Sequence, residues 1–436
     1  MHLTETEIKN YTDVIHNGLT VVTIEMPHIH TIELAIFVKA GLRFENKNNN
    51  GISHFLEHMI FRGNKFYPDS ISLNKEFEKI GRDLRASTLS EYTFYGFSPH
   101  VSQLAKGMEL FANLLSYPNF KDLEVERKII LEEYLEEINE NGDNIDINNH
   151  ACKLLYKDTP LALPTIGIEN TIKSLDVNAL REYYKNYYIP KNMILVGAGP
   201  LSHSHFLELA EKNFNEVRSQ GQPISRDHFV NSITENQNKP AFAYQYDSDS
   251  QIQLQICFRS VSYNHPDYYK VYLINRILDD GVTSRLQRGL REKLGLAYAI
   301  DCRATSLSDV GTFDFDVAVS KEKIPKITRA ILDEIKAFVE SGPTIDEVEH
   351  VKTRYLYDLD FDLDDPYKQI LRYGFVQLFS EEISDEKEKQ IIQAITPSEI
   401  HETAKGIFVR NKLNLIMVGP VTENIKIELE HLANQF

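Results

Sequence analysis

The chain has 436 residues, of which 42% are hydrophobic and 25% are charged, and this length and composition suit two or three soluble globular domains. Its formal net charge of −17 at pH 7 argues against binding of nucleic acid, which requires a basic surface, and no segment is apolar for long enough to cross a membrane. The polar, acid-containing N-terminus resembles neither a signal peptide nor a transit peptide, so we expect a cytoplasmic protein.

The first half of the chain alternates strand and helix patterns. Apolar strands are predicted at 19–25 and 32–39, and the poor alternation of the second indicates burial on both faces. After a turn rich in Asn and Gly, a helix is expected to begin with Ser53 as its N-cap. Further helices are predicted at 70–80, 101–115, 123–138 and 177–188, and a strand at 192–197.

The second half repeats this plan. It follows a polar segment, 219–240, whose richness in Gln, Asn, Ser and Pro is typical of a linker. Strands are then predicted at 252–259 and 312–319, and helices at 268–278 and 324–340.

The two halves also end alike. Residues 192–200 read NMILVGAGP and residues 413–420 read LNLIMVGP, and each strand pattern is followed by a polar turn and a helical pattern. Repetition of both these short sequence segments and the order of the elements indicates a duplication. We therefore predict an α+β (α/β) fold of two homologous lobes, 1–218 and 241–436, each a mainly antiparallel sheet with helices packed on one side. Two such lobes often form a site between them, so a clam-shell cavity is expected.

The three cysteines suggest neither a disulfide framework nor a thiolate metal site. Cys152, Cys257 and Cys302 are far apart in the sequence and odd in number, and none belongs to a CxxC pair. Free, buried thiols are therefore expected.

Histidines and a glutamate in the segment 51–61, GISHFLEHMIF, form the most specific motif of the chain. His54 and His58 are one helical turn apart, about 40° around the axis, so both imidazoles can approach one metal ion. Glu57 projects beside them, where it can take a proton from a metal-activated water without binding the metal. The order H-x-x-E-H is the inverse of the zinc-peptidase motif H-E-x-x-H, although an amphipathic helix can also carry two histidines by coincidence.

A third ligand is required, because catalytic zinc takes three protein ligands and keeps one position for water. The acidic helix predicted at 123–138 contains Glu126 and Glu133, which lie about 20° apart on one helical face. One can bind the metal while the other orients a ligating histidine. Position alone does not choose the ligand among Glu132, Glu133, Glu136 and Glu137.

The motif belongs to a longer set of recognisable segments. They are GLRFE (41–45), GISHFLEHMIFRG (51–63), the helix with Glu126 and Glu133, PLALPTIGIENTIKSL (160–175), YYIPKNMILVGAG (187–199) and SRLQRGLREKLGLAYAI (284–300). Together they resemble the pitrilysin/insulysin family of inverted-zincin metallopeptidases, and specifically its short, two-lobed branch with mitochondrial processing peptidase. The resemblance runs nearly from end to end of the chain.

The resemblance implies the ligand set. In that family the third ligand is a Glu far downstream of the second His, and another functional Glu precedes it by two helical turns. Glu133 lies 75 residues after His58, and Glu126 lies seven residues before Glu133. The resemblance therefore implies one Zn²⁺ per chain, held by His54, His58 and Glu133, with Glu126 as the supporting acid.

Arg291 and Tyr298, seven residues apart in the segment 284–300, match a pair that in the family reaches the zinc site from the other lobe. The resemblance implies that they bind the peptide and help to stabilise the tetrahedral intermediate, and a guanidinium and a phenol are suitable donors for a developing oxyanion. Without the resemblance, an exposed helical Arg and a Tyr at the start of a strand would explain both residues.

Arg85, Ala86 and Ser87 contain a departure from the family pattern. The family usually has Asn-Ala before a Thr in the edge strand that lines the substrate, whereas residues 84–88 read LRAST here. An Asn side chain both donates to and accepts from a peptide backbone, but Arg only donates. As a hypothesis, Arg85 recruits an acidic side chain or a peptide carboxylate, and an unchanged cleavage profile in Arg85→Asn would contradict it.

The resemblance implies a zinc endopeptidase that cleaves unfolded peptides or presequences in an enclosed cavity, where the substrate adds a strand to the sheet edge. Because the zinc motif and the Arg/Tyr pair occur in one chain, a homodimer is expected, and a heterodimer with a related subunit is the alternative. Two further alternatives are a non-catalytic scaffold subunit, which the complete ligand set argues against, and a zinc-dependent peptide-binding module, which Arg85 keeps open.

Overall fold

The chain divides into two compact units that do not coincide with the two halves of the sequence. Unit 1 comprises residues 1–135, 163–228 and 359–382, and unit 2 comprises residues 136–162, 229–358 and 383–436. Each unit therefore contains one segment from the other half of the chain.

The structure is a computed structural model. It describes residues 8–82, 84–215, 221–225, 228–229, 233, 237–296, 299–379 and 383–436. The predicted linker at 219–240 therefore lies partly outside the described residues.

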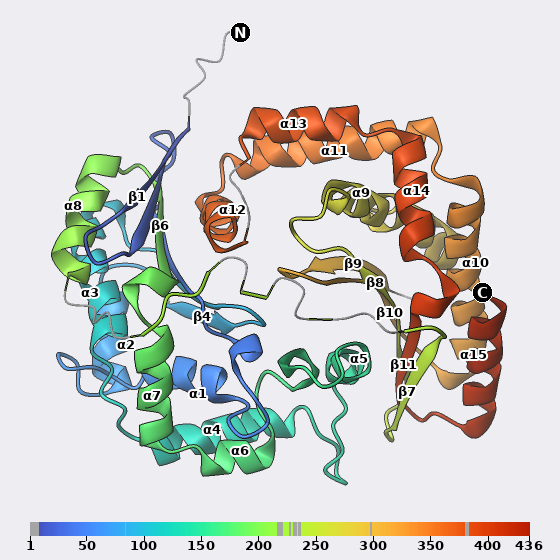
Figure 1. Ribbon diagram of the computed structural model, residues 1–436, viewed down its shortest axis with the longest axis horizontal. Coiled ribbons are helices and arrows are strands. Elements are labelled where there is room, and N and C mark those ends of the chain that lie inside the picture. Colours follow the sequence, from blue (N-terminus) through green and yellow to red (C-terminus); the bar gives the residue numbers. More distant parts are fainter. Residues whose placement is uncertain are drawn as a thin grey trace. The chain divides into compact units, whose positions relative to one another are not determined.

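Unit 1 is built on a six-stranded sheet in the order β1-β2-β6-β3-β5-β4 (Figure 1). β2 and β6 pair in parallel and all other neighbours are antiparallel. The strands are β1 Lys9–Val14, β2 Thr20–Glu25, β3 Glu33–Val38, β4 Arg85–Thr88, β5 Thr93–Phe97 and β6 Met193–Gly199. Every residue of β3 is buried, which confirms the burial on both faces that its weak alternation predicted.

Helices cover both faces of this sheet. They are α1 Ile52–Ile60, α2 Ser70–Glu78, α3 Leu104–Ser116, α4 Leu123–Leu135, α6 Glu169–Ser174, α7 Val177–Tyr187, α8 His203–Phe214 and α12 Pro366–Phe379. α12, which comes from the distal part of the chain, packs on β3 and β6, on the face opposite α3 and α8 (Figure 1). A Cβ atom at Gly374 would overlap the ring of Phe37, so this glycine permits the close approach of helix and sheet.

Unit 2 is built on a five-stranded sheet in the order β7-β11-β8-β10-β9, in which β7 and β11 are parallel and the other pairs antiparallel. The strands are β7 Ala241–Tyr246, β8 Ile252–Ser260, β9 Ile300–Ser306, β10 Gly311–Val319 and β11 Leu413–Gly419. The helices are α5 Ile147–Leu155, α9 Tyr268–Asp279, α10 Ile324–Ser341, α11 Ile345–Asp362, α13 Asp385–Ala394, α14 Pro397–Ile407 and α15 Glu423–Gln435. α5, from the first half of the sequence, packs on β8 and β11.

The predicted duplication is visible in β6 and β11, the strands that come last in sequence in the two sheets. β6 and β11 each pair in parallel with one strand and antiparallel with the next, and each ends in a glycine with positive φ, +144° at Gly199 and +138° at Gly419. A Cβ atom would lie 2.6 Å from the carbonyl oxygen of Thr31 at Gly199 and 2.6 Å from that of Gln251 at Gly419. In both units, therefore, the glycine that ends the strand lies close to the backbone just before its antiparallel neighbour, β3 or β8. The prediction of two similar α+β lobes is confirmed.

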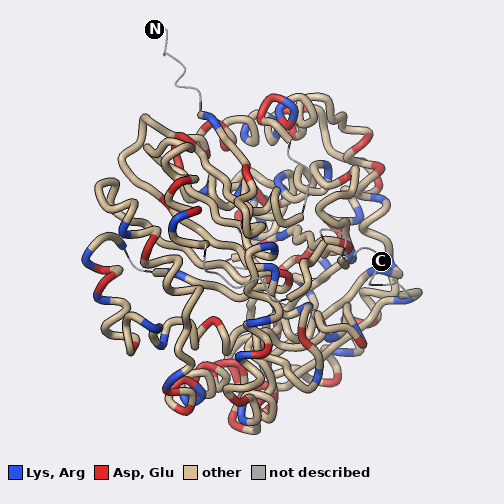
Figure 2. Tube along the Cα trace, turned by 60° about the vertical axis from the view of Figure 1, so that its left-hand side comes forward, with Lys and Arg blue, Asp and Glu red and all other residues tan. Residues whose placement is uncertain are grey.

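Charged residues are spread over the whole chain. Figure 2 shows acidic and basic residues interspersed along the trace, so the net charge of −17 does not come from one acidic tail. None of the described helices is long and apolar enough to span a membrane.

Asp314 on β10 gives unit 2 a testable dependence on pH. Burial raises the pKa of its carboxyl from 3.8 to about 7, although Thr312 donates a hydrogen bond to it at 2.7 Å. A carboxyl with a raised pKa in the folded state stabilises the fold at pH below 3.8, and this contribution is lost as the pH rises to about 7. Asp314→Asn is therefore expected to flatten the fall in the free energy of unfolding between these pH values, measured by urea denaturation. An equal effect of Asp301→Asn, at an exposed position of β9, would contradict this assignment.

Candidate metal centre

Helix α1 turns one face to the core of unit 1 and presents its two histidines on the other. Its apolar residues Ile52, Phe55, Leu56, Met59 and Ile60 are all buried. The expected N-cap is wrong: the helix begins at Ile52 after Gly51, and Ser53 lies inside the first turn with its hydroxyl 2.8 Å from that of Tyr183. The spacing of the apolar residues places the two histidines on the partly exposed face.

Two histidines of α1 and a glutamate of α4 converge. The Nε2 atoms of His54 and His58 are 3.2 Å apart, and the two carboxylate oxygens of Glu133 each lie 3.6 Å from one of them. Two imidazole nitrogens and a carboxylate are the donor set of catalytic zinc sites. Among the residues that the structure describes, this is the one group of three or more His, Cys, Asp or Glu side chains close enough to hold a metal ion.

The two histidines differ in protonation, and His54 is the one prepared to bind a metal at neutral pH. Burial lowers the pKa of His54 to about 3, with repulsion from His58 adding to the effect, so this imidazole is neutral at pH 7. Burial would also lower the pKa of His58, but its hydrogen bond with Glu126 and the nearby carboxylates raise it above its usual value. A ligating imidazole must offer a lone pair, and His54 does so at neutral pH without losing a proton.

Glu126 orients His58. Its Oε1 lies 2.8 Å from Nδ1 of His58, and its Oε2 lies 3.3 Å from Nε of Arg62. When Nδ1 carries the proton and donates it to Glu126, the lone pair of Nε2 is free to face Glu133. The two glutamates, seven residues apart on α4, thus contact opposite nitrogens of the same ring.

Glu126→Ala is expected to weaken zinc binding about 10–100-fold, because His58 then loses the acceptor that fixes its tautomer. Competition with a chromophoric chelator measures the affinity. Glu132→Ala, at an exposed position of the same helix, is the matched control and should bind zinc like the wild type. Equal affinities of the two variants would contradict the role of Glu126.

Glu57 lies close enough to His58 and Glu133 for its charge to interact with both, but it is not part of the ligand group. Its side chain is buried, and Thr88 at the end of β4 donates a hydrogen bond to its Oε2 at 2.6 Å. Burial raises the pKa of Glu57 above its usual 4.5, although the hydrogen bond from Thr88 opposes the rise. Carboxylate oxygens have several acceptor positions, so a carboxylate that Thr88 holds can still take a proton.

β4 is the edge strand of the sheet of unit 1, and its backbone alternates in direction. The N–H group of Leu89 donates to the carbonyl of Tyr92 at 2.9 Å, which continues the β4–β5 register by one residue. Antiparallel pairing alternates, so Arg85 and Ser87 also bond to β5, while Ala86 turns its N–H and C=O outward. No other described strand pairs with this edge, so Ala86 can bind an added strand.

Arg85 directs its charge away from this edge. Its Nη2 donates to Oε2 of Glu33 at 2.6 Å, and its guanidinium lies 5.2 Å from the ring centre of Tyr367. The side chain passes over Gly96, the residue of β5 that pairs with Arg85. A Cβ atom at Gly96 would lie 3.4 Å from Nη2 of Arg85. Arg85, Glu33 and Tyr367 help to line a cavity of about 790 Å³ that contains none of the predicted ligands. An acidic substrate group would have to compete with Glu33 for Arg85.

Of the predicted pair in the second half of the sequence, Arg291 is described and Tyr298 lies outside the described residues. Arg291 belongs to unit 2 and lies in a π-helix, Gln287–Lys293, with its side chain 44% exposed. Such turns are rare and often occur at functional sites. The meeting of this pair with the metal ligands stays a prediction.

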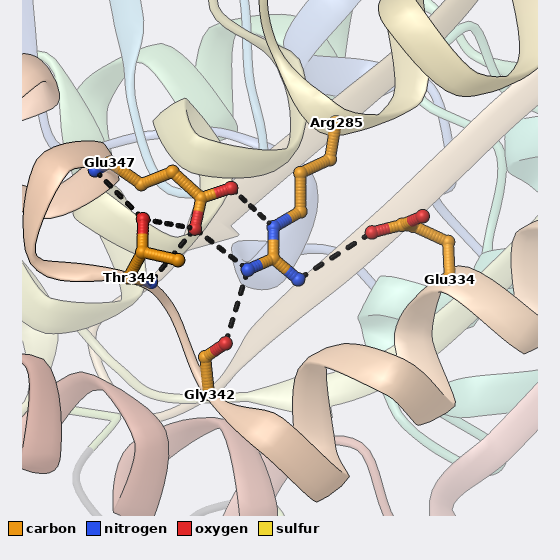
Figure 3. A network of polar contacts seen from close by, with 5 residues as sticks. All are labelled: Arg285, Glu334, Gly342, Thr344 and Glu347. Carbon is orange, nitrogen blue, oxygen red and sulfur yellow. Dashed lines mark hydrogen bonds and ion pairs between the residues drawn. The ribbon is translucent and has the colours of Figure 1, made fainter.

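Arg285 anchors the start of that segment (Figure 3). Its Nε and Nη2 each lie 2.7 Å from a carboxylate oxygen of Glu347, and Nη2 also donates to the carbonyl of Gly342 at 3.1 Å. Nη1 lies 3.5 Å from Glu334, and the guanidinium covers the ring of Phe338 at 4.8 Å. This bidentate arrangement fixes the chain six residues before Arg291.

Sequence reasoning missed three partners of the predicted residues: Thr88, Arg62 and Glu33. Arg62 follows His58 by four residues, just beyond Phe61, the C-cap of α1, so the spacing of one helical turn could have indicated it. Glu33 precedes Arg85 by 52 residues, and only the sheet register brings them together.

Comparison with known families agrees with this geometry. The family described as insulinase, peptidase family M16, matches residues 20–169. The family described as peptidase M16 inactive domain matches residues 174–355. The two matches adjoin and cover the metal-centre helices and the segment with Arg291.

Relatives match over most of the chain. An uncharacterized zinc protease of Rickettsia bellii is 28% identical over 418 residues, which are 93% of this chain and 96% of the relative. A probable mitochondrial-processing peptidase subunit beta of Schizosaccharomyces pombe is 29% identical over 320 residues, 70% of this chain and 68% of the relative. The crystal structure of a protease from Helicobacter pylori superposes with a TM-score of 0.86 at 20% identity, covering 94% of this chain and 100% of that one. The two adjoining family matches and the shared fold establish that the chain belongs to peptidase family M16 and is related to mitochondrial processing peptidase.

Proposed function

We propose that the protein is a zinc-dependent endopeptidase that cleaves unfolded peptides or leader peptides. The observation that carries the proposal is the convergence of His54, His58 and Glu133, with Glu57 near enough for its charge to interact with His58 and Glu133. The name zinc protease of the Rickettsia relative supports the choice of metal.

The donor set fits zinc, since two neutral imidazole nitrogens and one carboxylate are its usual ligands in hydrolases. When bound, zinc supplies a Lewis acid for the scissile carbonyl and makes water acidic enough to attack at neutral pH. His54, His58 and Glu133 would hold the ion, one per chain, and Glu126 would keep His58 in the required tautomer.

The remaining steps belong to side chains of this protein. Glu57 takes the proton of the attacking water and returns it to the leaving amine, while Thr88 holds its other oxygen. The backbone of Ala86 binds the extended peptide as an added strand, flanked by Arg85 and Ser87. Arg291 and Tyr298 would donate hydrogen bonds to the charge that develops on the carbonyl oxygen.

Peptide cleavage by the purified protein tests the proposal. The zinc-loaded protein is incubated with a mixed library of peptides of different lengths, and the products are identified by mass spectrometry. Internal cleavage that stops on removal of zinc by a chelator and returns with added zinc is expected. Binding of zinc without cleavage of any peptide would favour the non-cleaving alternatives, a peptide-binding module or a scaffold subunit.

The active assembly is proposed to be a homodimer, because one chain contains both the metal motif and the Arg/Tyr pair. The name of the Schizosaccharomyces relative, a subunit beta, supports a heterodimer with a related chain as the second candidate. Analytical ultracentrifugation of the active preparation separates them, since a homodimer is active without any second polypeptide.

A further inference from the structure

Helix α1 begins without a capping side chain of its own. Its N-cap residue is Gly51, and the hydroxyl of Ser53 contacts Tyr183 instead of the backbone. The first N–H groups of a helix have no partner within the helix, so acceptors must come from elsewhere in the chain.

Glu45 supplies these acceptors from the preceding turn. Its Oε2 accepts from the backbone N–H of Gly51 at 2.7 Å, and its Oε1 accepts from that of Ser53 at 2.9 Å. The side-chain amide of Asn50 also donates to Oε2, at 3.0 Å. Glu45 is 4% exposed, and both of its oxygens are used. A carboxylate six residues upstream therefore acts as the cap of α1.

Residue 51 cannot provide the cap itself. A Cβ atom at Gly51 would lie 2.6 Å from the carbonyl oxygen of Ile166 and 2.7 Å from Cα of Gly167, and its φ of +89° disfavours other residues. Asn50 stabilises this contact between the two backbone segments, because its side-chain amide donates a hydrogen bond to the carbonyl of Pro164 at 2.9 Å. This close contact of two backbones makes a distant cap necessary.

Burial of the Glu45 carboxylate would be costly in free energy if nothing favoured its negative charge. The nearby Arg43 pairs with Glu91 at 2.7 Å, and the described part of the chain gives Glu45 hydrogen-bond donors but no paired cation. Burial raises the pKa of Glu45 to about 7, against hydrogen bonds that lower it. The positive end of the helix dipole is the partner that favours its charge.

The two histidines of α1 are held in different ways. His58, in the last turn, is fixed through its Nδ1 by Glu126 at 2.8 Å. Among the described residues, the buried Nδ1 atom of His54 has no hydrogen-bond partner, so no side chain holds this ring through Nδ1 as Glu126 holds that of His58, while its Nε2 faces His58 and Glu133. His54 follows Ser53 directly, and Ser53 is one of the two residues whose N–H group Glu45 binds.

We infer that Glu45 is a positioning residue of the metal centre: it fixes the first turn of α1 and thereby the imidazole of His54. The inference rests on the proposed zinc-dependent function. Glu45 touches neither the metal ligands nor β4, the edge strand on which the peptide is proposed to bind. Its effect reaches the metal through the backbone of Ser53 and His54.

The test compares Glu45→Gln and Glu45→Ala with the wild type in the full chain. Zinc affinity is measured by chelator competition, and the coordination geometry by the visible absorption spectrum of the cobalt-loaded protein. Both variants are expected to bind zinc about 10–100-fold more weakly, the range found for residues that orient metal ligands, and to show altered cobalt bands. In cleavage assays at saturating zinc, kcat should fall while KM is unchanged, because the peptide edge at Ala86 is not affected.

Asp69→Ala is the matched control. Asp69 caps the neighbouring helix α2 by accepting from the N–H of Ser72 at 2.8 Å, so this variant also removes a helix cap from unit 1. It is expected to lower the melting temperature without changing the zinc affinity or the cobalt spectrum. If Glu45→Ala does not fold, Glu45→Gln decides the question, because Gln keeps the size of Glu and one acceptor oxygen.

The possible failures are distinguishable. A folded Glu45→Gln with the zinc affinity and cobalt spectrum of the wild type would overturn the inference and leave Glu45 a purely stabilising role. A wild-type protein that binds no zinc would overturn the proposed function, and the inference with it.

Discussion

Glu57→Gln is expected to slow peptide cleavage strongly while leaving the metal bound. Gln has the shape of Glu and can still accept the hydrogen bond from Thr88, but it cannot take a proton from water. Loss of a general base typically costs about 10²–10⁴-fold in rate, so kcat should fall by that factor. Single-peptide kinetics and zinc content, measured on the same preparation, check both parts of the expectation.

The exposed Glu78 of α2 provides the control, since Glu78→Gln makes the same chemical change away from the metal centre. It should cleave peptides at the wild-type rate. Cleavage that survives in Glu57→Gln would show that another group is the base. Loss of zinc together with activity would mean that Glu57 is itself a ligand.

Glu133→Gln is expected to remove zinc from the protein. The carboxylate of Glu133 lies 3.6 Å from Nε2 of both histidines, and a neutral amide oxygen is a much poorer ligand for a divalent cation. The loss of affinity should exceed the roughly 10–100-fold expected for the supporting residue Glu126. Chelator competition gives the affinity, and activity should return only at very high zinc concentrations.

Four acids were candidates for the third ligand: Glu132 and Glu133 lie on α4, and Glu136 and Glu137 follow its last residue, Leu135. The sequence left the choice among them open until the family resemblance selected Glu133. Glu132→Gln, at the adjacent exposed residue, should bind zinc like the wild type. If Glu132→Gln loses zinc instead, the assignment of the third ligand is wrong.

Local periodicity was sufficient to predict much of this fold. The apolar residues of α1 and the seven-residue spacing of Glu126 and Glu133 are properties of single helices, so they can be read without knowledge of the tertiary structure. The repeated strand ends, β6 and β11, predicted the duplication because each must end in a glycine where the chain comes close to its neighbour.

Other features depend on contacts between distant residues. The predicted halves do not coincide with the compact units, because α5 and α12 each pack on the sheet of the opposite half, and no local pattern reports such an exchange. β4 has only four residues, so periodicity alone could not identify it. The cap of α1 was predicted at Ser53, but Glu45 provides it. The contact of Gly51 with the backbone of Ile166 and Gly167, which leaves no room for a capping side chain at residue 51, is not visible in the sequence.

The central claim is that one zinc ion binds between His54, His58 and Glu133. Crystals of the protein grown with zinc, with diffraction data collected on both sides of the zinc absorption edge, test it most directly. The account predicts one strong anomalous peak per chain, within coordination distance of Nε2 of both histidines and of the Glu133 carboxylate. A peak at other residues, or none at this site in a protein that cleaves peptides, would contradict it.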